Sequence, residues 1–129
     1  LGLNPYTHDS IAWCGLFIAT VAKRARKEVV KDPLWAANWR TFGIEANEAM
    51  LGDILVFKRP GGNHVALYIG EDSGTYHVLG GNQADQVSIT RILKERCFAV
   101  RRPIYKIGQP GNVRKIFIDA IGPVSSNEA

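Results

Sequence analysis

The sequence predicts an α+β domain, with helices near the start of the chain packed on an antiparallel sheet of about five strands. Apolar residues recur at helical spacing before residue 43, whereas short apolar segments bounded by turn residues follow from Asp53 onward. Helices followed by a run of strands are typical of this class, because alternating strands and helices would indicate a parallel sheet. We expect residues 1–105 to form one domain and residues 106–129 an extension of unknown role.

The first expected helix begins near residue 10, where Asp9 or Ser10 can cap it. Its buried face is predicted from apolar residues at helical spacing, which are Ile11, Cys14, Phe17, Ile18 and Val21. The helix then becomes basic in the run KRARK, where cations suit the negative end of the helix dipole. A second helical stretch is expected from Pro33 to Gly43, since proline favours a helix start and glycine a helix end.

The expected strands are segments rich in β-branched and aromatic residues, at 53–59, 64–70, 76–81, 86–92 and 97–103. The segments PGGN and EDSG supply turns between the first three of them. Further along, Asn112 could cap a short helix, or the run KIFI could be a strand.

The composition is that of an ordinary globular protein, with 46% hydrophobic and 22% charged residues. The net charge of +4 and an isoelectric point near 9.3 could favour an anionic partner, although a solvated basic surface explains them as well. We expect no nucleic-acid partner, because aromatic and basic residues are not interleaved. We expect no membrane insertion, because no apolar run approaches the roughly 20 residues that a spanning helix needs.

Cys14 lies in the stretch DSIAWCGLF and is expected in or just past the first turn of the first helix. The unpaired N–H groups and the dipole at a helix start stabilise an anion, which lowers the pKa of a thiol. A buried cysteine that serves as a small apolar residue is the simpler interpretation, and Cys14 also fits the apolar face. On Cys14 alone we favour this simpler interpretation.

A thiol nucleophile needs a base, and the base needs a group that orients it. His64 follows the turn PGGN and starts a strand, which puts an imidazole at the rim of the sheet. Asn82 ends the next expected strand, so antiparallel pairing would bring it beside His64, where its amide oxygen could fix the imidazole tautomer. His8 and His77 are weaker candidates, because His8 lies in a loop and His77 in mid-strand.

Other chemistries find less support in the sequence. A zinc site would need His and Cys at short spacings, and here they are scattered. The turn PGGN lacks the lysine–serine end of a phosphate loop, and no Gly-x-Ser-x-Gly elbow starts a serine triad. We therefore expect neither a metal ion nor a cofactor.

A series of motifs in this chain resembles the CHAP and NlpC-like cysteine peptidases, which are papain-like enzymes that cut bacterial peptidoglycan. The motifs are DSIAWCGLF, GDILVFKR, HVALYIG, VLGGNQADQVSI and a closing RRP, and the resemblance covers residues 3–103. A phage-associated branch with WC before the helix and LGGNQ after the histidine strand is especially similar. The resemblance implies a papain-like fold and action as an endopeptidase or an N-acetylmuramoyl-L-alanine amidase.

The resemblance also implies Cys14 as nucleophile, His64 as general base and Asn82 as the third member of a Cys-His-Asn triad. The candidate substrate-binding residues are Tyr6, Trp13 and Gln83. The family pattern is broken at Gly80, where many CHAP members carry an acidic residue, so that orientation of the imidazole would fall to Asn82. The implied partner is peptidoglycan, and we expect the isolated domain to be a monomer.

The implied location is a protein made in the cytoplasm that acts on the wall in the periplasm or outside the cell, alone or within a virion or phage tail assembly. Other functions stay open: an inactive structural or wall-binding module, a nucleic-acid-binding domain, or a hydrolase of other amides, as in toxins and effectors. An inert Cys14 would favour the binding module. We also predict that Cys14 and Cys97 are not bonded to each other, since a nucleophile must stay reduced.

Overall fold

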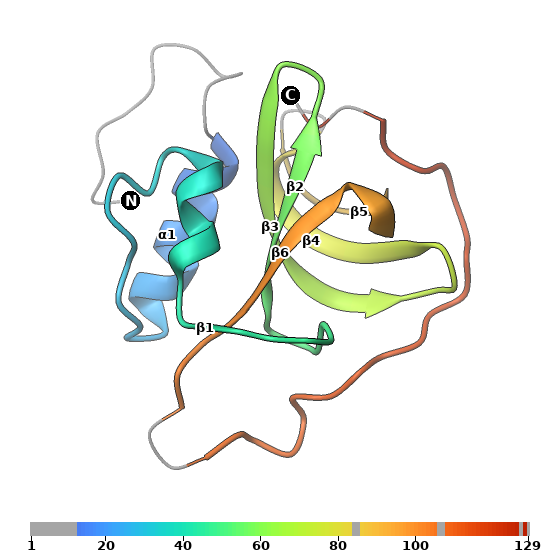
Figure 1. Ribbon diagram of the computed structural model, residues 1–129. Helices are drawn as coiled ribbons and strands as arrows, with labels where there is room; N and C mark the ends of the chain where they lie inside the picture. The colour runs from blue at the N-terminus through green and yellow to red at the C-terminus, as the bar shows by residue number, and fades with distance from the viewer. Residues whose placement is uncertain (1–12, 84–85, 106–107, 127, 129) are drawn as a thin grey trace.

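The computed structural model describes residues 13–83, 86–105, 108–126 and 128 (Figure 1). It contains one α-helix, α1 (Trp13–Arg24), and two short 3₁₀-helices, η1 (Ala36–Thr41) and η2 (Lys94–Arg96), within these residues. The strands are β1 (Ile44–Glu45), β2 (Ile54–Arg59), β3 (Gly62–Glu71), β4 (Thr75–Gln83), β5 (Gln86–Leu93) and β6 (Cys97–Arg102). None of the helices in the described part of the chain has the length and apolar character needed to cross a bilayer.

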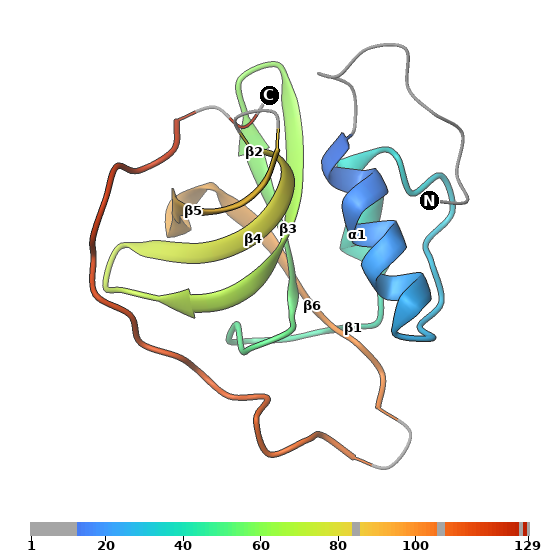
Figure 2. The same ribbon diagram turned by 180° about the vertical axis from the view of Figure 1, so that it is seen from behind.

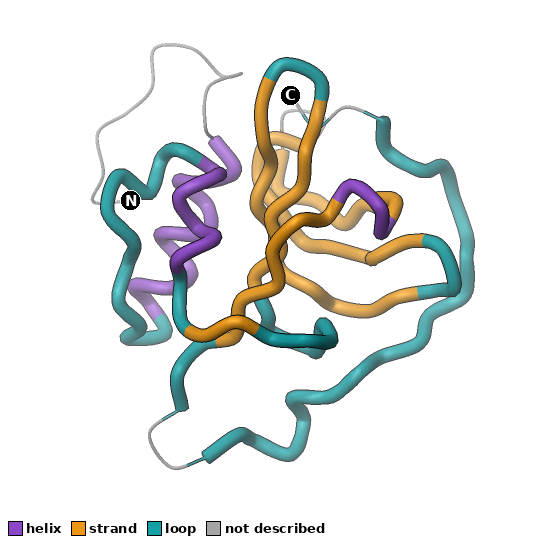
Figure 3. The backbone as a smooth tube through the Cα atoms, viewed as in Figure 1, coloured by secondary structure: helices purple, strands orange, loops and turns teal. Residues whose placement is uncertain are grey.

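All the strands belong to one antiparallel sheet with the order β1-β6-β2-β3-β4-β5 (Figure 3). Strands β2 to β5 form a meander, because each pairs with the next along the chain. Strand β6 then returns to the free edge of β2, where β1 adds to its outer side. The β2–β3 hairpin turns at Gly61, whose φ of +77° is one that residues with a side chain rarely adopt.

The expected fold class is wrong, because the sheet dominates the described residues, which contain one α-helix and not the papain-like arrangement of N-terminal helices. The stretch expected as a second helix forms only the six-residue η1. Trp35 and Phe42, which flank η1, both have extended backbones, so the helical conformation does not continue in either direction. The sheet also has six strands, since β1 pairs with β6. No helix follows Asn112 in the described residues, and Phe117 instead bridges to Glu71.

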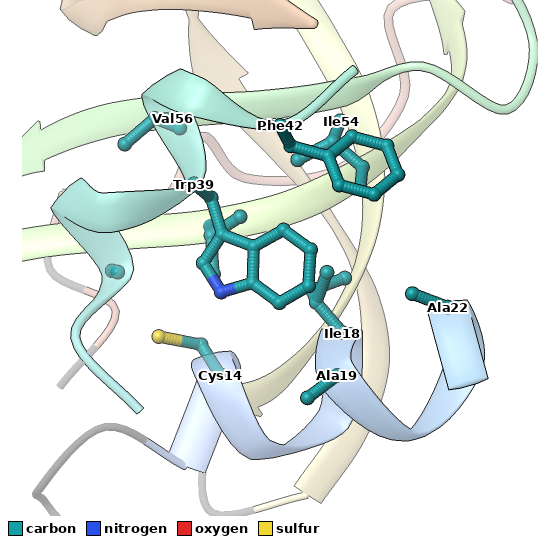
Figure 4. Packing of buried hydrophobic residues seen from close by; sticks show 10 residues of the cluster. Cys14, Ile18, Ala19, Ala22, Trp39, Phe42, Ile54 and Val56 are labelled. Carbon is teal, nitrogen blue, oxygen red and sulfur yellow. The ribbon is translucent and has the colours of Figure 1, made fainter. Parts of the chain in front are cut away.

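One face of the sheet is covered by α1 and η1 (Figures 1 and 2). The indole of Trp39 is fully buried there, and its Nε1 donates a hydrogen bond of 2.9 Å to the carbonyl of Pro33. Figure 4 shows this ring beside Cys14 and Ile18 of α1. The cluster on this face consists of Cys14, Ile18, Ala19, Ala22, Ala36, Trp39, Phe42, Ile54, Val56 and Val65. We call this side of the sheet the helix face.

The other face carries a second apolar cluster, which consists of Ala49, Leu55, Phe57, Ala66, Tyr68, Val78 and Ile92. Residues 113–126 and 128 run along this side of the molecule, and we call them the strap (Figures 1 and 2). The N–H of Glu71 donates to the carbonyl of Ile116 at 2.7 Å, and the N–H of Ile118 donates to the carbonyl of Glu71 at 2.9 Å. The side of the sheet with this cluster is the strap face.

Buried charges also fasten the strap to the sheet. Glu128 is 1% exposed, and its carboxylate accepts hydrogen bonds from both terminal nitrogens of Arg96. The N–H of Ser125 donates to the carbonyl of Arg91 at 2.8 Å, and its hydroxyl donates to Glu128 at 2.6 Å. Bidentate pairs of this kind hold a segment in one geometry, because both partners lose their freedom together.

Candidate functional site

Three chain segments that the sequence places far apart meet at one end of the molecule. The start of α1, the β2–β3 hairpin and the end of β4 all lie at the same end in the two opposite views (Figures 1 and 2). Cys14 is the second residue of α1 and shares an apolar cluster with Val65, the residue that follows His64. The fold therefore brings the thiol-bearing turn of the helix against the strand that carries His64.

The electrostatic surroundings of Cys14 favour the neutral thiol. Burial raises the pKa of Cys14, which is 3% exposed, and this outweighs the factors that lower it. Those opposing factors are hydrogen bonds from the backbone of Val65 and of Gly15, and then the positive charge of Arg59. The environment thus has the groups that stabilise a thiolate, but the thiol is closed off from water in this arrangement.

His64 lies on the strap face, whereas Cys14 lies on the helix face. His64 is paired directly with Phe57 across the β2–β3 ladder, and their ring centroids are 6.4 Å apart. Residues directly opposite each other in a ladder project to the same face, and Phe57 belongs to the strap-face cluster. Val65 projects to the helix face, since side chains alternate along a strand. The sheet therefore separates the imidazole from the thiol.

Asn82 lies near the end of β4, on the strand next to His64. The β3–β4 register pairs Leu67 with Leu79 and Tyr68 with Val78. In the described residues the β3–β4 ladder ends at Leu67 and Leu79, before it reaches the hairpin end that carries His64. The expectation that a strand start and a neighbouring strand end share one rim agrees with this topology.

Several of the predicted site positions fall outside what the structure describes. Tyr6 and His8 lie outside the described residues, as do Asp9 and Ser10, the expected helix caps. For Trp13, Asn82 and Gln83 the structure describes the backbone only: Trp13 begins α1, and the other two belong to β4.

A buried carboxylate lies within electrostatic range of His64. Burial by itself raises the pKa of Glu128, but hydrogen bonds from Arg96 and Ser125 outweigh it, and the charges of Arg96 and His64 also lower this pKa. The pKa of Glu128 is therefore held below its ordinary value. Sequence reasoning missed this residue, because nothing near Glu128 in the chain indicates a long-range partner.

Arg59 is a second charged residue that sequence reasoning missed. Its Nε donates to the carbonyl of Asn63 at 3.3 Å, and one terminal nitrogen donates to the carbonyl of Pro60 at 3.0 Å. These bonds fold the side chain over the end of the β2–β3 hairpin. The sequence could have identified Arg59, because this residue directly precedes the turn PGGN. A hairpin end of this kind lies at the rim of the sheet, where His64 was expected.

His77, the other described histidine, serves the turn between β3 and β4. Its Nε2 lies 2.8 Å from Oδ2 of Asp72, and this oxygen also accepts hydrogen bonds from the Thr75 hydroxyl and from Arg91. The other oxygen, Oδ1, accepts from the backbone N–H of Thr75. The Thr75 hydroxyl is the main cause that holds the pKa of Asp72 below its usual range. Since these donors satisfy the Asp72 carboxylate, the cluster closes a turn and offers no open acid or base.

The two thiols lie apart, with Cys14 on the helix face and Cys97 packed against the strap-face cluster, and neither forms a disulfide. Burial raises the pKa of Cys97 to about 11. No set of three or more His, Cys, Asp or Glu side chains is placed to hold a metal ion within the ranges that the structure covers.

Comparison with protein families, with characterised proteins and with solved structures finds no match for this chain.

Proposed function

We propose that this protein is a cysteine-dependent amide hydrolase that cleaves the stem peptides of peptidoglycan. The observation that carries the proposal is the contact between Cys14, in the first turn of α1, and the backbone of Val65, the neighbour of His64. A helix start offers N–H groups to a thiolate and to an oxyanion, and the strand supplies the base. The resemblance to CHAP and NlpC-like peptidases in the motifs around these residues supports the same chemistry.

The proposed reaction begins when Nδ1 or Nε2 of His64 takes the thiol proton of Cys14. The thiolate attacks the scissile carbonyl carbon, and the backbone N–H of Cys14 donates to the oxyanion that forms. The C–N bond then breaks as His64 returns the proton to the leaving amine, which leaves a thioester on Cys14. Water, deprotonated by His64, attacks the thioester and releases the acid and the free thiol.

This reaction requires the imidazole of His64 to reach the helix face. The hairpin end provides the freedom for this movement, because two glycines, Gly61 and Gly62, precede Asn63 and His64. A Cβ added at Gly61 would meet no atom within 4 Å, so the tip of the hairpin is open at this residue. In the proposed active arrangement residues 62–64 turn over, and the amide of Asn82 orients the imidazole.

The proposed substrate fits the charge at this end of the molecule. Stem peptides of peptidoglycan carry carboxylates, and Arg59 places a guanidinium near Cys14. Tyr6, Trp13 and Gln83 are proposed to contact the peptide or the glycan. We propose a monomer made in the cytoplasm that meets peptidoglycan in the periplasm or outside the cell, alone or as part of a phage particle.

The proposal is tested by digesting purified peptidoglycan with the wild type, Cys14→Ala, His64→Ala and Cys97→Ala, with fragments identified by mass spectrometry. The expected result is cleavage by the wild type and Cys97→Ala, and loss of nearly all turnover in the other two variants, because nucleophile and base act as one unit. Undiminished cleavage by Cys14→Ala would contradict the proposal. EDTA is the control, and activity should survive it.

A second candidate is a wall-binding module without catalysis. The burial of Cys14 and the position of His64 across the sheet favour this alternative. It predicts that the protein sediments with insoluble peptidoglycan, that Cys14 resists alkylation at neutral pH, and that no fragment is released. Release of defined fragments by the wild type alone would exclude it.

A further inference from the structure

We propose that the strap restrains the hydrolase by holding His64 on the face of the sheet opposite Cys14, through the buried carboxylate of Glu128. The inference rests on the proposed function, and it assigns a role to residues that follow the resemblance to cysteine peptidases.

The strap is fixed to the strap face at both of its ends. Near its start, the backbone of Glu71 exchanges hydrogen bonds with Ile116 and Ile118, and the hydroxyl of Tyr68 accepts one from the N–H of Ile116 at 3.1 Å. Gly70 leaves room for Ile118, since a Cβ at residue 70 would clash with Cδ1 of that side chain. Towards its end, Ser125 bonds to the carbonyl of Arg91. These bonds leave little freedom for the part of the strap that carries Glu128.

Arg96 links Glu128 to the strand beside His64. Its Nε donates to the carbonyl of Lys58 at 2.9 Å, while its terminal nitrogens hold the carboxylate of Glu128. In the sheet, Cys97 pairs with Phe57, and Phe57 pairs with His64, so these residues form one row across β6, β2 and β3. Arg96 immediately precedes this row and places the Glu128 carboxylate on the face where the His64 ring lies.

The charge of Glu128 favours the strap-face position of a protonated His64 ring, and in that form the ring cannot take the thiol proton of Cys14. His64 and Glu128 are both fully or almost fully buried, and buried charges are screened less than exposed ones. Moving the ring to the helix face, where the charge of Arg59 acts on Cys14, would take it away from this carboxylate. A contact that differs between two arrangements shifts their populations, so Glu128 favours the arrangement in which thiol and base are apart.

The test compares Glu128→Gln with Glu95→Gln in the otherwise intact chain. Both variants remove one negative charge, but Glu95 is exposed and lies beside Arg96, so it controls for charge alone. Two rates are measured for each protein: release of peptidoglycan fragments, and alkylation of Cys14 by iodoacetamide at pH 7, mapped by mass spectrometry. Ser125→Ala, which removes one hydrogen bond to Glu128, is the milder variant should Glu128→Gln fail to fold.

We expect both rates to rise by about tenfold in Glu128→Gln, because the substitution removes the negative charge that attracts the protonated ring of His64. We expect a smaller rise in Ser125→Ala and no change in Glu95→Gln. Unchanged rates in Glu128→Gln would overturn the inference, and so would slower hydrolysis, which would make Glu128 a support of the active arrangement or of the fold. If no protein releases fragments while alkylation of Cys14 still rises, the restraint stands and the proposed function fails.

Discussion

The helix face and the strap face of the sheet are covered by different means. On the helix face, α1 and η1 bury a cluster around Trp39. All members of this cluster are apolar, so its side chains contact one another without ion pairs. On the strap face, a segment without regular structure covers Tyr68 and its neighbours, and two buried carboxylates, Glu71 and Glu128, bind Lys94 and Arg96. The first face is held by packing, and the second is held by packing together with charge.

This difference has a structural cause. A helix satisfies its own backbone hydrogen bonds, so α1 can cover the sheet with apolar side chains only. The strap has no such internal ladder, and its N–H and carbonyl groups must bond to the sheet or to side chains. The strap can therefore detach from the sheet when its buried carboxylates lose their charge. The stability of the helix face depends mainly on the volumes of its buried side chains.

The largest expected effect is that of Trp39→Ala on the helix face. The indole is fully buried and donates to the carbonyl of Pro33, so the substitution leaves a cavity and an unpaired acceptor. We expect a loss of about 3–5 kcal/mol in the free energy of unfolding, measured by urea denaturation. Trp35→Ala is the matched control: Trp35 is 67% exposed, and its loss should cost less than about 0.5 kcal/mol. Equal losses in the two variants would contradict the packing described for this face.

A smaller effect is expected from acid, and it should act through the strap face. Burial alone raises the pKa of Glu71, but hydrogen bonds from Lys94 and Tyr68 outweigh it and hold the pKa below its ordinary value of 4.5. A carboxylate with a lowered pKa in the folded state stabilises that state above its ordinary pKa, and this contribution is lost as the pH falls through the folded value. Stability should therefore fall below about pH 4.5, as both Glu71 and Glu128 begin to take up protons.

The measurement is the urea midpoint between pH 7 and pH 3 in the wild type and in Glu71→Gln. The variant should lose about 1–3 kcal/mol at neutral pH, because a charge-assisted hydrogen bond is removed, and should depend less on pH than the wild type. Parallel pH curves for the two proteins would show that Glu71 does not contribute to the acid response.

Much of the secondary structure could be predicted from the sequence. The ranges expected as strands correspond to β2 to β6, because turn residues separate short runs rich in β-branched side chains. The apolar spacing around Ile18 also indicated α1. The helical stretch expected around Trp39 was too long, because the extended backbones of Trp35 and Phe42 limit it to the six-residue η1. Strand β1, with two residues, carries no pattern of its own.

The face on which His64 lies could not be predicted, and the reason is physical. In a strand with one solvent-exposed face, polar and apolar residues alternate, and this alternation reveals which side chains face the core. Strand β3 is covered on both sides, so it shows no such alternation. Its residues from Val65 to Tyr68 are apolar on both faces, so either orientation would satisfy the pattern. The position of Glu128 was equally hidden, because it depends on a partner, Arg96, that lies 32 residues away.

The most direct test of the account is the nuclear Overhauser contacts of the His64 ring in protein with labelled histidine and phenylalanine. The account predicts contacts between the ring protons of His64 and those of Phe57, and none with the β-protons of Cys14. The ring centroids of His64 and Phe57 are 6.4 Å apart, which brings their edge protons within range. Contacts from His64 to Cys14 in the wild type would contradict the separation of thiol and base, and with it the role assigned to the strap.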